Sequence, residues 1–275
     1  MKRQLVTGAS GFVGKRLLAD LKENGIQASG IDDEYFESQN WKQDLSKSLD
    51  SFNPEVVYHV GACSDTLEQD VQFMMLRNYE STKVITDWCI ENNRRIIYSS
   101  SAANYGESGF FPSNLYGWSK YVAEDYVIKC GGVALRYFNV YGPGEQHKGR
   151  MASFLHQAFL KYKAKQEIKL FPGKPLRDFI FIEDVITANI FAGKNYEALK
   201  GKYYEVSTGV AHSFEDKLDI LGLTYSYMDE SLIPIGYQFY TCGNPEKWMP
   251  GWFPKYSLES GVMEYKKKLE IESIN

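Results

Sequence analysis

The chain has 275 residues, of which 44% are hydrophobic and 24% are charged, and this composition excludes a disordered or fibrous protein. Lysine and arginine number 31 against 35 aspartate and glutamate residues, a net charge of −4, which argues against nucleic acid as a partner because such binding depends on neutralising phosphates. No apolar run approaches the roughly 20 residues of a membrane helix, so we expect a cytoplasmic protein without a membrane partner. Four widely spaced cysteines and four histidines indicate neither disulfides nor a metal site.

Short apolar runs alternate with helical patterns through the first half of the chain. Strands are predicted at residues 3–7, 26–31, 56–58, 96–98 and 133–138. Helices are predicted at residues 12–22, 71–92 and 116–129. This alternation is typical of a parallel α/β sheet, whose strands are buried on both faces and therefore read as continuous apolar runs.

The pattern becomes less regular after about Gly142. Helices are predicted at residues 154–162, 183–191 and 258–269, strands at 179–181 and 202–206, and a loop rich in proline and aromatic residues at 242–254. The fold class is therefore α/β, a Rossmann-type doubly wound parallel sheet with a smaller C-terminal substrate-binding lobe. We place the sheet mainly in residues 1–145 and the lobe mainly in residues 146–275, with some segments of the latter returning to the sheet.

Three glycines follow the first predicted strand and lead into the first helix. Gly8, Gly11 and Gly14 are spaced as GxxGxxG, and Asp32 ends the second predicted strand, 24 residues after Gly8. Glycines here allow a tight turn and a close approach of the backbone to a pyrophosphate, which binds at the helix N-terminus. A carboxylate at Asp32 can accept hydrogen bonds from the adenosine ribose. The arrangement predicts a dinucleotide site rather than a turn with a helix cap.

Asp33 bears on which dinucleotide binds. Two adjacent carboxylates repel the 2′-phosphate of NADP, and no arginine or lysine occurs between Ile31 and Trp41 to offset them. We therefore expect NAD, with NADP as the alternative.

A tyrosine and a lysine four residues apart lie on one face of a helix. A nearby ammonium favours the phenolate, so we expect the pKa of such a tyrosine to fall and its proton to exchange near neutral pH. The spacing occurs three times, as Tyr79–Lys83, Tyr116–Lys120 and Tyr196–Lys200. Only Tyr116 lies between two strong strand candidates and follows a serine at a strand end, Ser101, where an open α/β sheet has its ligand crevice. We interpret Ser101, Tyr116 and Lys120 as catalytic and the other two copies as solvated helix pairs.

These motifs carry a family resemblance. The runs TGASGFVG (residues 7–14), SSSAANYG (99–106), YGWSK (116–120) and RDFIFIEDV (177–185) resemble the extended short-chain dehydrogenases/reductases that act on nucleotide sugars. Within that family, HVGACS (59–64), RYFNVYGP (136–143), HKGRMAS (147–153) and YQFYT (237–241) are similar to the ADP-glyceromanno-heptose 6-epimerases. The resemblance spans about residues 1–241.

The resemblance implies epimerisation by transient oxidation and re-reduction at C6 of a nucleotide sugar, with an acid/base on each face of that carbon. Tyr116 matches one acid/base and Lys148 the other, while Ser101 would bond the reacting oxygen and Lys120 the nicotinamide ribose. It also implies a homo-oligomer. Further residues match substrate contacts of the family: Ser101, Asn139, His147, Lys148, Arg177 and Tyr237. Residues around the glycine turn and near strand ends match cofactor contacts: Gly8, Ser10, Gly11, Phe12, Val13, Gly14, Asp32, Asp33, Asp44, Leu45, Gly61, Ala62, Tyr116, Lys120 and Pro143.

Some positions depart from the family pattern. Ser101 and Tyr116 are only 15 residues apart, where the family has a longer loop. Residues 205–209 read EVSTG in place of NLGTG, and Gly236 replaces a basic residue before Tyr237. These changes affect expected contacts to the nucleotide and its diphosphate, so the base and the sugar are left open.

Three alternative functions remain. The first two are a nucleotide-sugar 4-epimerase and a 4-keto reductase that consumes external NAD(P)H. The third is a non-catalytic NAD-binding regulator, which the retained tyrosine and lysine disfavour. A 4,6-dehydratase is disfavoured because Ala102 and Ala103 stand where that group has an acid pair. His59 is expected to pack or bond locally, without a chemical role.

Overall fold

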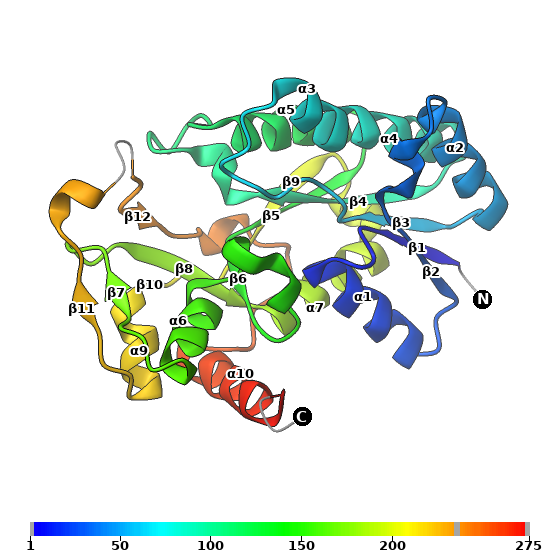
Figure 1. Cartoon of the computed structure of the whole chain (residues 1–275). Coiled ribbons are helices and arrows are strands. Elements are labelled where there is room, and N and C mark those ends of the chain that lie inside the picture. The colour runs from blue at the N-terminus through cyan, green and yellow to red at the C-terminus, as the bar shows by residue number, and fades with distance from the viewer. Residues whose placement is uncertain (1–2, 234–236, 273–275) are drawn as a thin grey trace. The chain divides into compact units, whose positions relative to one another are not determined.

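A six-stranded sheet organises the first of two units in the computed structural model, which describes residues 3–233 and 237–272 (Figure 1). The first unit comprises residues 1–136 and 186–204, and the second comprises residues 137–185 and 205–275. The sequence pattern places the main boundary at residue 145, nine residues later, and has some segments of the lobe return to the sheet, as residues 186–204 do here. In sheet order the strands are β2 (Ala28–Ile31), β1 (Gln4–Thr7), β3 (Val56–His59), β4 (Arg95–Ser101), β5 (Val133–Tyr137) and β9 (Lys202–Val206).

The register of this sheet brings the carboxyl ends of its strands together. β1 pairs in parallel with β2 and β3, and Thr7 lies opposite both Ile31 and His59. β3 pairs in parallel with β4, with His59 opposite Tyr98. The residues that follow these strands therefore meet at one edge, as the sequence pattern predicts for an open parallel sheet.

Helices cover both faces of this sheet. Figure 1 shows α2, α4 and α5 along one face and α1 and α7 along the other. Side chains from α2, α4 and α5 pack on Leu5, Val57 and Ile96 in a continuous apolar core. The helices of this unit are α1 (Phe12–Glu23), α2 (Trp41–Phe52), α3 (Val71–Met75), α4 (Ser81–Glu91), α5 (Leu115–Lys129), α7 (Ile182–Lys194, whose first turn belongs to the second unit) and α8 (Tyr196–Leu199).

Two features of this unit differ from the predicted elements. α2 was not predicted, because only Leu45 and Leu49 of its 12 residues are buried, which leaves a weak apolar stripe. The predicted helix at residues 71–92 is interrupted by a π-helical turn, Leu76–Glu80, between α3 and α4. Apolar periodicity does not reveal such a turn, because it inserts a single residue into an otherwise helical pattern.

The second unit is built on smaller sheets. β8 (Leu176–Phe181) pairs in parallel with β6 (Asn139–Tyr141) and β12 (Tyr240–Thr241) and antiparallel with β10 (Ala211–Ser213). A further parallel pair joins β7 (Lys169–Leu170) to β11 (Ser226–Tyr227). The helices of this unit are α6 (Phe154–Lys163), α9 (Phe214–Leu221) and α10 (Leu258–Glu272). Across the described ranges of both units, no helix combines the length and apolarity that crossing a bilayer requires.

Candidate active site

In the glycine turn between β1 and α1, backbone segments pack too closely for side chains to fit between them. Gly8 has a φ of +63°, and a Cβ there would lie 2.6 Å from the Cα of Gly61. A Cβ on Gly14 would lie 2.0 Å from the carbonyl oxygen of Gly8. Gly11 is the N-cap of α1 and has no side chain to bond the first helical turn, so the N-terminus of the helix can bind an anion. This geometry fits the pyrophosphate of a dinucleotide.

Asp32 lies beside this turn, as the sequence predicts. Its carboxylate accepts the backbone N–H of Ser10 at 2.9 and 3.1 Å and the Ser10 hydroxyl at 2.9 Å. Asp33 instead forms an ion pair with Arg77, whose guanidinium lies 4.2 Å from the ring centre of Phe36. The expectation that no cation offsets these carboxylates is therefore wrong, because Arg77 comes from the distant π-helical turn. The charge argument against NADP rests on Asp32 alone.

A buried histidine joins the strand ends next to the turn. His59 hydrogen-bonds through Nδ1 to Thr7 Oγ1 at 2.7 Å and through Nε2 to Thr82 Oγ1 at 2.8 Å. Thr7 Oγ1 also accepts the backbone N–H of Gly61 at 3.0 Å. Burial lowers the pKa of His59 to about 3, so the ring is neutral. His59 bonds locally, as expected, and its partner Thr7 is a positioning residue that the sequence did not reveal.

The other predicted cofactor residues fall into different settings. Ala62 follows Gly61 at the strand edge, and Phe12 is buried in α1. Asp44 and Leu45 lie on α2, where the Leu45 side chain is part of the apolar core, so a contact there would come from the backbone. Pro143 belongs to the second unit. Contacts from all of these positions to a dinucleotide stay predictions.

Two asparagines fix the start of the helix that carries Tyr116. Asn114 caps α5 by accepting the N–H of Gly117 at 2.8 Å. Asn78 donates to Ser119 Oγ at 2.8 Å and bonds the backbone of Cys63, accepting its N–H at 2.8 Å and donating to its carbonyl at 3.0 Å. One buried amide thus ties α5 to the loop after β3. Sequence reasoning missed Asn78, because its partners are 15 and 41 residues away.

The structure brings Ser101, Tyr116 and Lys120 together. Ser101 ends β4 and lies near enough to the phenol of Tyr116 to affect its pKa, and the Lys120 ammonium lies 4.4 Å from the ring centre of Tyr98. Burial raises the pKa of Tyr116, and the nearby Ser101 hydroxyl opposes that rise. Burial also lowers the pKa of Lys120 to about 7, against the attraction of Glu124. The expectation that Lys120 lowers the pKa of Tyr116 is therefore wrong, since burial is the largest effect on both groups and disfavours both charged forms.

Behind this group lies a buried ion pair that sequence reasoning missed. Glu124, two turns after Tyr116 on α5, pairs with Arg136 of β5 at 2.5 Å, and both are almost fully buried. Glu124 also accepts the Ser100 hydroxyl at 2.5 Å and the Asn104 amide at 3.1 Å. The pair joins α5 to β5, and the bonds to Ser100 and Asn104 join α5 to the end of β4, so Glu124 holds the predicted catalytic residues in register.

The other two YxxxK copies have structural roles. Lys83 pairs with Asp87 at 2.6 Å and Lys200 with Glu197 at 2.8 Å, both on helix surfaces. Tyr196 is not solvated as expected: it is buried, and its hydroxyl donates to the carbonyl of Gly131 at 2.9 Å.

The predicted substrate residues lie in the second unit, apart from Ser101. Asn139 is exposed at the start of β6, and His147 and Lys148 lie in the 3₁₀ turn Gln146–Met151. Burial lowers the pKa of Lys148, and Glu145 opposes that shift. Arg177 is largely buried; it donates to the carbonyls of Leu176 and Gln238 and lies 5.3 Å from the ring centre of Tyr237.

The departures from the family pattern take part in local structure. The carboxylate of Asp178 accepts the N–H groups of Thr208 at 2.8 Å, Gly209 at 2.8 Å and Gly243 at 3.1 Å. Ser207 Oγ accepts the indole N–H of Trp248 at 2.9 Å. The segment 205–209 is therefore tied to the aromatic-rich loop. Gly236 lies outside the described residues.

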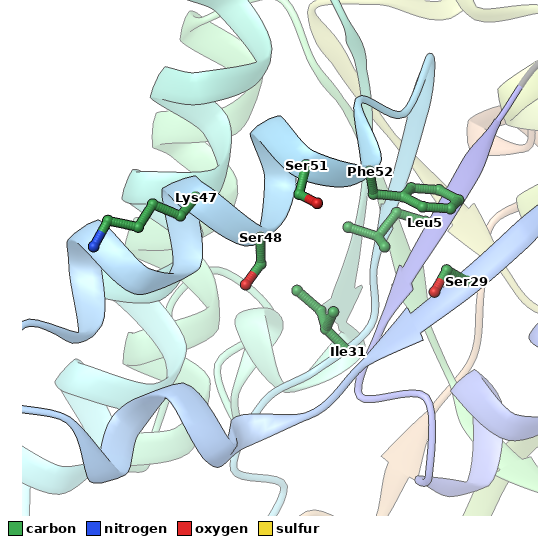
Figure 2. Close-up of a pocket in the computed structure, with 7 residues that line it drawn as sticks. All are labelled: Leu5, Ser29, Ile31, Lys47, Ser48, Ser51 and Phe52. Atoms are coloured by element: carbon green, nitrogen blue, oxygen red, sulfur yellow. The ribbon is translucent and has the colours of Figure 1, made fainter.

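A pocket in the first unit does not coincide with the predicted site. Figure 2 shows it between α2 and the β1–β2 edge, with Leu5, Ile31 and Phe52 facing it and Lys47 extending away. None of its lining residues is a predicted site residue, and Ile31 is the neighbour of Asp32 in the sequence. Over the ranges 3–233 and 237–272, no three histidine, cysteine or acidic side chains gather as a metal site would require.

Comparisons with known proteins agree with this geometry. The model of the NAD dependent epimerase/dehydratase family matches residues 4–207. The chain belongs to this family. A relative from Brachyspira hyodysenteriae, ADP-L-glycero-D-manno-heptose-6-epimerase, is 33% identical over 97% of each chain.

Solved structures of the NAD dependent epimerase/dehydratase type have the same fold. The crystal structure of the Helicobacter pylori ADP-L-glycero-D-manno-heptose-6-epimerase gives a TM-score of 0.83 at 28% identity, covering 98% of this chain and 96% of that one. The Thermus thermophilus UDP-glucose 4-epimerase in complex with NAD gives a TM-score of 0.78 at 22% identity, covering 96% and 99%. The Rossmann-type fold and the membership of a nucleotide-sugar epimerase family are thereby confirmed.

The role of Asp32 gives a prediction about the cofactor. We expect NAD to bind more tightly than NADP, and Asp32→Ala to weaken NAD binding roughly 10- to 100-fold, because a charge-assisted hydrogen bond is lost. Asp33→Asn is the comparison variant: it should keep NAD bound but move the ratio of the two affinities toward NADP, since it frees the charge of Arg77. Calorimetric titration of each protein with both dinucleotides measures this. Tighter binding of NADP to the unaltered chain would contradict the assignment.

Proposed function

We propose that this NAD-dependent nucleotide-sugar epimerase inverts C6 of an ADP-activated heptose by oxidising and then re-reducing that carbon. The observation that carries the proposal is the grouping of Ser101, Tyr116 and Lys120 at the strand edge that also holds the glycine turn. The relatives from Brachyspira hyodysenteriae and Helicobacter pylori, whose names state this activity, support the choice of sugar and nucleotide.

In this proposal Tyr116 serves one face of the carbon. Its phenol oxygen takes the proton of the C6 hydroxyl during oxidation, or returns it during reduction, and Ser101 holds the reacting oxygen. Bound NAD supplies the removal and return of hydride. Lys120 would hold a ribose hydroxyl of the bound dinucleotide.

Lys148 is assigned to the opposite face. Because burial lowers the pKa of its ammonium, the group can donate and accept a proton closer to neutral pH than an exposed lysine can. Asn139, His147, Arg177 and Tyr237 would bind the rest of the substrate, with the Arg177 guanidinium suited to the diphosphate. That assignment requires Arg177 to exchange at least part of its bonding to backbone carbonyls for the ligand. A homo-oligomer and a cytoplasmic location also stay predictions.

Solvent isotope incorporation tests the reaction type. A hydride that leaves a carbon and returns to it within a closed site does not mix with water. We therefore expect turnover of the ADP-heptose in heavy water to leave the C6 hydrogen unlabelled and to consume no external NAD(P)H. Mass spectrometry and NMR of the product measure the label, and absorbance at the nicotinamide band measures consumption.

The outcome separates this proposal from the alternatives. Deuterium at the inverted carbon would contradict direct oxidation at C6 and indicate proton abstraction next to a carbonyl. Stoichiometric loss of NAD(P)H would identify a reductase. Turnover of UDP-hexoses with inversion at C4, and none of ADP-heptose, would identify a 4-epimerase. Absence of turnover with every sugar would indicate a binding protein.

A further inference from the structure

A buried lysine in α9 has its ammonium next to two aromatic rings. Lys217 is 1% exposed, and among the described residues it makes no ion pair or hydrogen bond through its ammonium. The ammonium lies 3.5 Å from the ring centre of Phe179 and 4.2 Å from that of Tyr141. Aromatic faces attract a cation but do not replace the water it has lost. Packing alone therefore does not explain why a lysine occupies this buried position.

The charged group that acts on Lys217 is Glu145. This carboxylate is fully buried and belongs to the same unit, in the loop that follows β6. Burial lowers the pKa of Lys217 to about 7, and Glu145 opposes that shift. Glu145 also opposes the lowering of the Lys148 pKa. One buried carboxylate thus interacts with two lysines.

Glu145 also closes the loop that carries Lys148. Its carboxylate accepts the hydroxyl of Ser153 at 2.6 Å and the backbone N–H of Ser153, and it lies 3.5 Å from the N–H of Gly142. Its own carbonyl accepts the N–H of Lys148 at 3.0 Å. Both ends of the segment 142–153 are therefore held by one residue, which lies three positions before Lys148. Because Ser153 caps α6, the carboxylate also lies at the favourable N-terminus of that helix.

We propose that Glu145 is a positioning residue for Lys148, and that Lys217 is the buried counter-charge of Glu145. This inference rests on the proposed function, because it gives Lys148 the role of the second acid/base. The loop contains Gly149, which has a φ of +52° and no side chain that could pack against neighbouring residues. The hydrogen bonds to Glu145 therefore hold the loop in one conformation. In Glu145→Gln the amide can still bond to Ser153, but the charge is lost.

Kinetics with purified full-length variants tests the arrangement. Glu145→Gln should lower kcat roughly 10- to 100-fold, the size of effect that a misplacement of about 1 Å produces, with little change in KM. Lys217→Met should lower kcat less. In the double variant Lys217→Met should add nothing to Glu145→Gln, because residues that act through one another are not additive. Lys169→Met, on an exposed lysine of the same unit, is the matched control and should behave as the unaltered chain.

A second readout does not depend on activity. Lysines labelled with ¹³C by reductive methylation report their own protonation by NMR, and the Lys148 signal is assigned by its absence in Lys148→Met. Removing the Glu145 charge should lower the pKa of Lys148, since Glu145 raises it, whereas a purely structural contact would leave it unchanged. Circular dichroism and thermal unfolding establish that each variant is folded. If Glu145→Gln does not fold, Glu145→Asp retains the charge and should keep the Lys148 pKa closer to that of the unaltered chain than Glu145→Ala does.

The outcomes separate the inference from the proposed function. If Lys148→Met abolishes epimerisation but Glu145→Gln changes neither kcat nor the Lys148 pKa, the inference is overturned and the proposed function stands. If Lys148→Met retains full activity, the second acid/base is not Lys148, whatever the NMR signal shows. An equal loss from Lys217→Met in the presence and absence of Glu145 would overturn the role given to Lys217.

Discussion

Tyr116→Phe should lose epimerase activity by roughly 10²- to 10⁴-fold, the contribution that a positioned acid/base makes to proton transfer. The ring is retained, so α5 should keep its packing and its Asn114 cap. Only the phenol oxygen, whose pKa Ser101 affects, is removed. NAD should remain bound, because Tyr116 makes no expected contact with the dinucleotide phosphates. Steady-state turnover and calorimetric titration with NAD measure the two effects.

The chain offers a matched control for this substitution. Tyr79 occurs in the same YxxxK spacing, packs edge-on against Tyr126 at 6.2 Å and lies away from Ser101 in the sequence and in its contacts. Tyr79→Phe should therefore keep turnover close to that of the unaltered chain. Substantial turnover by Tyr116→Phe, or equal losses from both variants, would remove the phenol of Tyr116 from the mechanism.

Lys148→Met should also abolish epimerisation, by a similar factor, while NAD stays bound. Methionine keeps the length of the side chain but cannot carry a proton. If each acid/base serves one face, Lys148→Met should still dismutate an aldehyde analogue of the intermediate by the chemistry of the face that Tyr116 serves. Product analysis by NMR, with the aldehyde and with the ADP-heptose as separate substrates, measures both reactions.

The result for Lys148 decides between an epimerase and a reductase. A reductase needs one acid/base, so Lys148→Met would keep its activity and would consume NAD(P)H in proportion to product. An epimerase needs a proton donor on each face. Lys169→Met controls for the loss of a lysine charge in the second unit, and its 3.3 Å pair with Glu167 lies on the surface.

The elements of the first unit could be predicted wherever one apolar face is buried. The strand predicted at residues 202–206 matches β9, and the helix predicted at 116–129 differs from α5 by one residue. α2 escaped prediction because only two of its 12 residues are buried, and α9 because it has only eight residues. The two-residue strands of the second unit, such as β7 and β12, are defined by pairing across the chain, which local periodicity cannot report.

Spacing in the sequence identified site residues that lie on one helix or in one βαβ unit. It missed contacts between residues that are far apart in the sequence. Gly8, Gly14 and Asp32 follow from one βαβ pattern, and Tyr116 with Lys120 from one helix turn. The ion pair between Asp33 and Arg77 joins residues 44 positions apart, and it changed an electrostatic argument drawn from neighbours alone. Likewise, burial is the largest effect on the pKa of Tyr116, and the four-residue spacing from Lys120 does not indicate how deeply either side chain is buried.

Because of the π-helical turn Leu76–Glu80, the number of residues in the helical segment 71–91 determines where the Asn78 side chain points. An α-helix advances about 100° per residue, so one residue fewer before Asn78 would restore regular winding and rotate its amide by about that angle. The amide would then point away from Ser119 and from the loop at Cys63, which it now joins. Insertions at a surface loop cost little, because the chain absorbs them locally. A deletion of one residue between Val71 and Asn78 would instead break the contact between Asn78 and α5, the helix that carries Tyr116. Natural variation in chain length should therefore avoid this segment.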